Sequence, residues 1–210
     1  MAKIKDKYDV AIIGSGLGGL QCAYILSKHG YKVAVFEKNH QIGGSLQVFS
    51  RQKTIFDTGV HYLGGLSEGQ NLSQYFKYFG LTTDKLKLRQ LDINCFDSIE
   101  FGDDFDTFPL AQGYKNFADS LKRQFPQEAK AIDEYCFLIR DYCSKFKLYN
   151  LDVPGMSDYT SDPDLLESNA YDVIDSLTSN KTLTAVLAGN MMLYAGHKER
   201  TPFFVHALVT

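Results

Sequence analysis

The sequence predicts an α/β fold at its start, followed by a β-rich middle and a helical second half. Two apolar runs rich in β-branched residues, 8–13 and 32–37, flank a segment with the apolar spacing of a helix. Strand, tight turn, helix and strand within about thirty residues form a βαβ unit, in which the two strands run parallel. Glycine is also concentrated here, with ten of the 17 glycines in the first 65 residues. Because glycine allows positive φ and close backbone approach, we expect this segment to wrap a ligand.

The composition excludes several classes of protein. With 44% apolar and 22% charged residues, a chain of 210 residues is globular rather than disordered or fibrous. A net charge of -3 argues against a nucleic-acid partner, which would call for a basic excess. No apolar run approaches the length that spans a bilayer. Four scattered cysteines without a CxxC motif predict reduced thiols and a cytoplasmic location.

The later elements follow from changes in periodicity. Residues 46–57 predict two short strands around a polar turn, and residues 70–79 predict a helix that ends at Gly80. Alternation over residues 85–109 predicts antiparallel strands. Helical spacing then takes over, interrupted by a polar loop at 151–165, and the predicted helices cover residues 116–125, 128–146, 171–180 and 181–193.

The first turn has the pattern of a phosphate-binding loop. GSGLGG leaves a predicted strand and opens a predicted helix, which is the context that gives this glycine motif its meaning. Gly14 permits the sharp turn, Gly16 lets backbone approach a pyrophosphate, and Gly19 lets the helix pack closely on the strand. The helix N-terminus would offer unpaired N–H groups and partial positive charge to an anion.

A carboxylate stands where such a fold binds ribose. Glu37 ends the second predicted strand, 23 residues after Gly14, and it can accept hydrogen bonds from both hydroxyls of an adenosine ribose. The same charge repels a 2′-phosphate, so the site disfavours NADP.

Two further glycine clusters favour FAD over NAD. The doublet Gly43 and Gly44 would let a second backbone segment approach the longer flavin dinucleotide, although an ordinary loop turn would also contain such residues. The third cluster, FDTGVHYLGG at residues 56–65, contributes Gly59. His61 in that loop would either face a flavin ring or, more commonly, stabilise the loop by a hydrogen bond.

These residues carry a family resemblance. The segment from DVAIIGSGLGGLQ to EKNHQIGGSLQVF resembles the FAD-binding N-terminus of the phytoene desaturase and amine-oxidase-like flavoproteins. FDTGVHYLGG and QNLSQYFKYFGL look closest to the branch of carotenoid desaturases, carotenoid isomerases and retinol saturases. Many relatives carry Arg or Lys after the doublet, whereas this chain has Ser45, which favours the retinol-saturase-like branch.

The resemblance implies an FAD-dependent oxidoreductase that transfers a hydride to or from a conjugated, apolar, carotenoid-like or retinoid-like substrate. It implies a Rossmann-like FAD/NAD(P)-binding part at residues 1–69 and a mixed β and helical substrate-domain portion at residues 70–210. It also implies a longer natural protein, and we therefore expect the fold to be incomplete at the C-terminus. The predicted cofactor-binding residues are Gly14, Ser15, Gly16, Leu17, Gly18, Gly19, Glu37, Lys38, Gly43, Gly44, Ser45, Gly59 and His61.

Other interpretations stay open at this point. The chain could be a small NAD(H)-dependent reductase, although no catalytic Tyr-Lys pair is evident, or a non-catalytic nucleotide-binding remnant. No metal-ligand spacing occurs among the five histidines. Tyr135, Leu138, Tyr142 and Phe146 share a predicted helix face and would line a substrate pocket or, more commonly for such a stripe, form core. An apolar substrate leaves room for peripheral membrane contact, and the sequence does not fix the oligomeric state.

Overall fold

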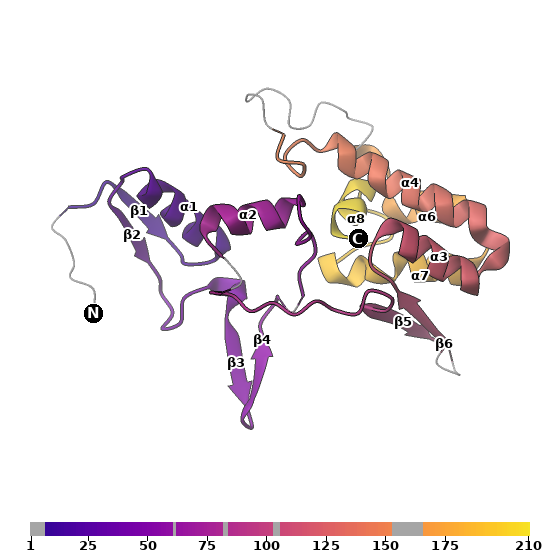
Figure 1. The fold of residues 1–210 in the computed structure, drawn as a ribbon, viewed down its shortest axis with the longest axis horizontal. Helices are drawn as coiled ribbons and strands as arrows, with labels where there is room; N and C mark the ends of the chain where they lie inside the picture. The colour runs from indigo at the N-terminus through magenta and orange to yellow at the C-terminus, as the bar shows by residue number, and fades with distance from the viewer. Residues whose placement is uncertain (1–6, 61, 82–83, 103–105, 153–165) are drawn as a thin grey trace. The chain divides into compact units, whose positions relative to one another are not determined.

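In a computed structural model, the chain forms two compact units, residues 1–85 and residues 86–210. The structure describes residues 7–60, 62–81, 84–102, 106–152 and 166–210. The first unit holds a parallel strand pair and the second is mainly helical (Figure 1), which confirms the predicted mixed α/β class with a βαβ start. The predicted division after residue 69 concerns cofactor and substrate roles and stays a prediction.

The first unit begins with the predicted βαβ element. Strands β1 (Val10–Ile13) and β2 (Val33–Phe36) pair in parallel, with Val10 opposite Val33 and Ile13 opposite Phe36. Helix α1 (Leu17–Lys28) connects them and packs beside the strands (Figure 1). Gly30, with φ of +89°, follows the helix end and allows the chain to reverse into β2.

A hairpin and a second helix complete this unit. Strands β3 (Val48–Arg51) and β4 (Thr54–Asp57) pair antiparallel, as predicted. Both residues of their two-residue turn, Gln52 and Lys53, have positive φ, which matches the right-handed twist of a tight hairpin. A short 3-10 helix, η1 (Gly44–Leu46), precedes the hairpin. Helix α2 (Asn71–Phe79) ends at Gly80 in the left-handed conformation, as the sequence predicts.

The second unit opens with an antiparallel pair, β5 (Asp97–Phe101) and β6 (Asp106–Leu110). The strands fill only part of the predicted segment, because residues 84–96 form no strand. Side chains hold this stretch instead: Gln112 Nε2 donates to the carbonyls of Leu91 and Asp92, and Asn116 Nδ2 donates to that of Ile93. These bonds, with that from Gln112 N to the Ile93 carbonyl at 2.8 Å, satisfy residues 91–93 without a strand ladder.

Helices form the rest of the second unit. They are α3 (Tyr114–Gln124), η2 (Pro126–Glu128), α4 (Ala129–Lys145), α6 (Ala170–Leu177), α7 (Lys181–Ala188), η3 (Gly189–Tyr194) and α8 (Phe203–Val209). Helix α4 packs along α8 and α3, while α6 contacts α7, α8 and α4. The final apolar run, unassigned by the sequence, forms α8.

A continuous apolar core lies among these helices. Tyr135 is 1% exposed, and Leu138 and Tyr142 pack against the core, so the aromatic stripe of α4 contributes to core packing. Cys136 and Cys143 are buried as free thiols. The buried core residues are Leu110, Ala118, Leu121, Phe125, Ala131, Ile132, Tyr135, Cys136, Ile139, Cys143, Ala170, Ile174, Leu183, Val186, Leu187, Phe203 and Ala207.

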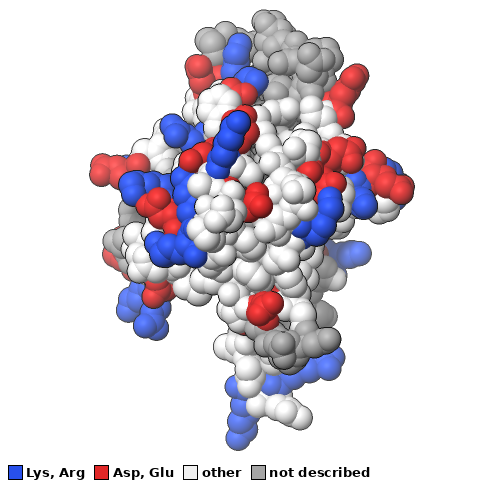
Figure 2. All heavy atoms as spheres, turned by 90° about the vertical axis from the view of Figure 1, so that its right-hand side faces the viewer, with Lys and Arg blue, Asp and Glu red and all other residues white. Residues whose placement is uncertain are grey.

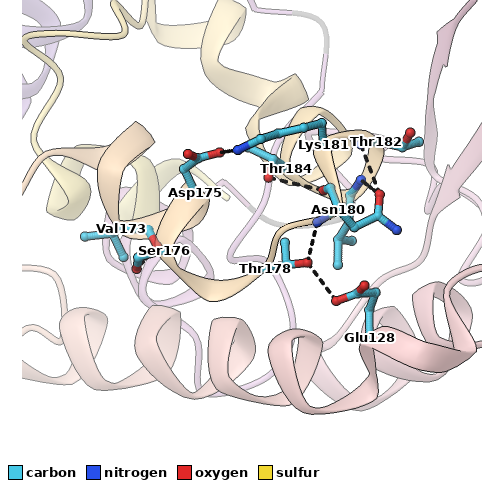
Figure 3. Close-up of polar contacts among 10 residues, drawn as sticks. Glu128, Val173, Asp175, Ser176, Thr178, Asn180, Lys181, Thr182 and Thr184 are labelled. Carbon is cyan, nitrogen blue, oxygen red and sulfur yellow. Dashed lines mark hydrogen bonds and ion pairs between the residues drawn. The ribbon is translucent and has the colours of Figure 1, made fainter.

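Two polar arrangements fix helices within this core. The buried His206 ring on α8 is bonded on both nitrogens, with Tyr135 Oη 2.7 Å from Nε2 and Tyr194 Oη 2.7 Å from Nδ1. Figure 3 shows the turn between α6 and α7, where Thr178 Oγ1 donates to Glu128 Oε2 at 2.7 Å and accepts from Asn180 N at 2.9 Å. This turn is thereby tied to the start of α4.

The surface carries mixed charge. On the face shown in Figure 2, Lys and Arg side chains are interspersed with Asp and Glu over most of the molecule, and exposed ion pairs such as Lys115 with Asp119 join neighbouring turns of one helix. Of the helices built by the described residues, none combines the length and apolar character needed to cross a bilayer.

Candidate cofactor-binding site

The predicted phosphate loop forms a sharp turn between β1 and α1. Gly14 has φ of +94°, and its N–H donates to the carbonyl of Phe36 at 2.7 Å, which fixes the ends of both strands together. Gly16 is the N-cap of α1, without a side-chain cap hydrogen bond and without an acidic residue in the first turn. Leu17 and Gly18 lie in that first turn. The uncapped helix start therefore presents N–H groups suited to an anion.

The glycines of the motif have distinct surroundings. A Cβ on Gly19 would overlap the carbonyl oxygen of Gly14 and lie 3.4 Å from Cγ2 of Ile12. Only glycine allows this close packing of helix on strand, as the sequence predicts. A Cβ on Gly16 or Gly18 would meet no atom within 4 Å. At Gly16 the open side is the space that a close ligand would need.

The Glu37 carboxylate is held by the phosphate loop itself. Ser15 N donates to Oε2 of Glu37 at 2.9 Å, and Ser15 Oγ donates to the same oxygen at 2.6 Å. Asn39 N donates to the other oxygen, Oε1, at 2.9 Å. These hydrogen bonds, led by that of the Ser15 hydroxyl, lower the pKa of Glu37 to about 2. Glu37 is thus an ionised acceptor at neutral pH, while the adjacent Lys38 is exposed.

The glycine doublet lies directly against the phosphate loop. Gly43 is buried with φ of +115°, and its N–H donates to the carbonyl of Ser15 at 3.0 Å. Gly44 has φ of +57°, and a Cβ there would lie 3.0 Å from Cα of Gly16. Ser45 follows in η1 with its side chain exposed. The doublet is therefore more than a loop turn, because it brings a second backbone segment to the loop.

One residue of the third glycine cluster, Gly59, lies beside the segment that carries the doublet. Gly59 follows β4, and a Cβ on it would lie 3.4 Å from the carbonyl oxygen of Ser45. Thr58 N donates to the carbonyl of Gln47 at 3.0 Å, which keeps the chain beside η1. His61 lies outside the described residues. The structure thus brings the phosphate loop with the start of α1, Glu37, the doublet with Ser45, and Gly59 into one neighbourhood, and the contact of every predicted residue with a cofactor stays a prediction.

The sequence predicts Ser15 at the site but not the role of its side chain, and it does not indicate Asn39. Ser15 entered only as a member of the motif, yet its side chain joins the loop to Glu37. Asn39 was not singled out at all, although its N–H bonds the carboxylate. The available signal for Ser15 was a hydroxyl residue between two glycines of a buried turn, where it needs partners of its own. Among the described residues, no three His, Cys, Asp or Glu side chains gather as metal ligands would.

Comparison with known proteins agrees with this geometry. The family described as an NAD(P)-binding Rossmann-like domain matches residues 12–79. All-trans-retinol 13,14-reductase of Danio rerio is 31% identical over 99% of this chain and 36% of its own length, and that of Homo sapiens is 30% identical over the same shares. Prolycopene isomerase 2 of an Oncidium hybrid cultivar is 30% identical over 71% of the chain. The resemblance predicted from the sequence is confirmed.

Solved structures show the same fold. Wild-type putrescine oxidase bound to putrescine superposes with a TM-score of 0.57 at 15% identity, covering 96% of this chain and 41% of that one.

The sequence relatives also include an inactive protein and are longer than this chain. One relative from Danio rerio, 32% identical over 89% of the chain, is an inactive all-trans-retinol 13,14-reductase. The chain spans about a third of the length of the curated relatives that it matches over nearly its whole length.

Proposed function

We propose that this chain, a distant homologue of all-trans-retinol 13,14-reductases and prolycopene isomerases with a Rossmann-like NAD(P)-binding domain, is the FAD-binding part of an oxidoreductase. Its substrate would be a conjugated, apolar molecule of the retinoid or carotenoid kind, which is what the names of these relatives suggest. FAD, when bound, supplies hydride transfer, and the protein supplies binding and orientation.

One observation carries the proposal: the second glycine segment lies against the phosphate loop, and the third lies beside the second. Gly44 lies against Gly16, and Gly59 lies near Ser45 beside the doublet. A nicotinamide dinucleotide requires only the first of these segments, whereas the second and third extend the approach of backbone along a longer dinucleotide. This arrangement therefore supports FAD.

The residues present suit the pyrophosphate and the adenosine ribose of that cofactor. The N–H groups of the α1 start would receive the pyrophosphate. Glu37, ionised and accepting, would bond a ribose hydroxyl of the adenosine half and would repel a 2′-phosphate. Ser45 would offer a neutral hydroxyl to a phosphate where an Arg or Lys would offer charge. The absence of charge at that position places more of the phosphate binding on backbone groups.

A second candidate function is NAD(H) binding. The matching domain family is described as NAD(P)-binding, and Glu37 suits the unphosphorylated ribose of NAD equally well. Because one relative is an inactive reductase, cofactor binding and catalysis need separate tests.

The binding test uses the whole chain and three ligands. FAD, NADH and NADPH are titrated by calorimetry, and the visible spectrum is recorded after mixing with FAD and gel filtration. We expect one FAD per chain with retained flavin absorption, weaker NADH binding and no NADPH binding. NADH binding without FAD binding would establish the second candidate instead, and no binding of any of the three would contradict both.

A matched pair of variants tests the role of the doublet. Gly44→Ala and Gly69→Ala both introduce a side chain at positive φ, but only Gly44 faces Gly16, and a Cβ on Gly69 meets nothing within 4 Å. We expect FAD affinity to fall at least about tenfold for Gly44→Ala, since the doublet and the phosphate loop must move apart to admit the methyl group. Gly69→Ala should keep wild-type affinity. Equal effects would show that backbone strain, rather than the cradle, determines binding.

A further inference from the structure

We infer that Ser15 is a positioning residue for the cofactor: it fixes the Glu37 carboxylate and the Gly43 turn in the arrangement that receives a hydroxyl of an unphosphorylated ribose. This inference rests on the proposed function and extends it to a residue that contributes through its neighbours. It assigns to one side chain the coupling of the phosphate loop to two positions that lie 22 and 28 residues further along the chain.

Ser15 occupies a buried position, where a hydroxyl group requires hydrogen-bond partners. It is 1% exposed, and it and Gly43 are the two buried positions among the described residues of the first unit. Alanine would fill such a turn without any polar requirement, whereas a buried hydroxyl without partners is destabilising. The hydroxyl here has partners on both sides, so its presence couples those partners.

The directions of the hydrogen bonds follow from the donors available. Ser15 Oγ has a single proton, and the ionised carboxylate of Glu37 can only accept, so Oγ donates to Oε2. Gly43 N–H then donates to the oxygen atoms of Ser15, lying 3.0 Å from the carbonyl oxygen and 3.2 Å from Oγ. The Ser15 side chain therefore links the backbone of the doublet turn to the Glu37 carboxylate, so the position of one depends on the other.

The arrangement also selects which carboxylate oxygen can receive a ligand. Two donors of Ser15, N and Oγ, bond Oε2 of Glu37 and use its two lone-pair directions. A ribose hydroxyl would therefore bond at Oε1, which Asn39 N already orients. The short distance of 2.6 Å from Ser15 Oγ is typical of a charge-assisted hydrogen bond, which resists rotation of the carboxylate.

The test is a double-mutant cycle read by FAD affinity. The variants are Ser15→Ala, Glu37→Ala and the double variant, with Ser27→Ala on the exposed surface of α1 as control. We expect Ser15→Ala to raise the Kd for FAD about tenfold or more, since a charge-assisted hydrogen bond is lost. In the Glu37→Ala background the same change should raise Kd less than about threefold. An equal effect in both backgrounds would overturn the inference, because Ser15 would then contribute independently of Glu37.

A ligand-side measurement separates positioning from a structural role. Wild-type protein should bind ADP more tightly than 2′-deoxy-ADP, which lacks one ribose hydroxyl, and Ser15→Ala should reduce that ratio toward one. A variant that loses affinity for both ligands with an unchanged ratio would show a structural role only and would overturn the inference.

Two controls keep the outcome interpretable. If Ser15→Ala does not fold, it is replaced by Ser15→Cys, which retains a weak donor of similar shape. The ratio of ADP affinity to 2′-deoxy-ADP affinity is then measured on that variant. If the wild-type protein and Ser15→Ala bind FAD equally well, this inference is contradicted and the proposed function is not. Wild-type protein that binds neither FAD nor ADP contradicts the proposed function itself.

Discussion

The two units of this chain achieve order by different means. In the helical unit, seventeen apolar side chains form one buried core. The His206 ring lies inside that core, with both of its nitrogens hydrogen-bonded to tyrosine hydroxyls. In the βαβ unit, Ile13 is 92% exposed and Phe36 is 60% exposed. Parallel sheets in stable domains are usually covered on both faces. The difference teaches that backbone hydrogen bonds and glycine contacts organise the candidate site, while apolar packing organises the second unit.

Truncation of one apolar side chain in each unit should show the largest contrast. Leu121→Ala removes a fully buried side chain from α3, and we expect it to lower the free energy of unfolding by about 2–5 kcal/mol. Ile13→Ala removes one that is almost fully exposed, and its effect should stay within about 0.5 kcal/mol. Urea unfolding followed by circular dichroism, with hydrogen exchange of each unit, measures both. A cost for Ile13→Ala equal to that of Leu121→Ala would remove the contrast.

The units should also differ in the pH at which they lose stability. Burial lowers the pKa of His206 from 6.5 to about 4. Between these values the unfolded chain binds a proton that the folded chain does not, so stability falls as pH decreases through this range. The full shift corresponds to roughly 3 kcal/mol. Urea unfolding at pH 7, 5.5 and 4 should show this slope, and His206→Gln should remove it.

Glu37 provides the comparison in the first unit. Because hydrogen bonds lower its pKa from 4.5 to about 2, its contribution is present above pH 4.5 and is lost as pH falls toward 2. Glu37→Gln should therefore flatten the pH dependence of local exchange near Ser15 below pH 4.5 and leave the slope between pH 6.5 and 4.5 unchanged. A change in the higher range on this substitution would contradict the assignment of the two windows.

A glycine pair in α1 sharpens the account of the first unit. Gly19→Ala places a Cβ onto the carbonyl oxygen of Gly14, and the resulting overpacking should destabilise this unit by about 1–3 kcal/mol. Gly18→Ala meets open space in the same helix turn. Because alanine favours helix over glycine, it should leave stability unchanged or raise it by up to about 1 kcal/mol. Hydrogen exchange of α1 and β1 measures both, and equal losses would show that packing is not the cause.

The smallest expected effect concerns the turn drawn in Figure 3. Asn180 Oδ1 accepts from Thr182 N and Leu183 N at 3.1 Å each and so caps α7. Asn180→Ala should lower the free energy of unfolding by about 1 kcal/mol. Lys181→Met removes only the exposed ion pair with Asp175, and its effect should be the smaller of the two. The reverse order in urea unfolding would indicate that the ion pair, rather than the cap, holds the turn.

Much of the fold follows from local signals in the sequence. The βαβ start, the strand pair predicted over 46–57 and the end of α2 at Gly80 follow from apolar periodicity and turn residues, and all are present, the strand pair as β3 and β4 over 48–57. The prediction of strand is wrong for residues 85–96, where the carbonyls of residues 91–93 are bonded by the side chains of Gln112 and Asn116, some twenty residues later in the chain. The final apolar run could not be assigned, since the partner that makes it a core helix, α4, lies some sixty residues earlier in the chain.

For the candidate site, the sequence by itself determined which residues are available: a phosphate-loop motif, a carboxylate at ribose-binding distance along the chain, and two further glycine clusters. Such signals are local, because backbone conformation and helix polarity depend on neighbouring residues. Only the tertiary structure decided that Gly44 lies against Gly16 and that Ser15 bonds both Glu37 and Gly43. Those contacts join segments more than twenty residues apart, and side-chain hydrogen bonds of that span follow from three-dimensional packing, which sequence spacing does not encode.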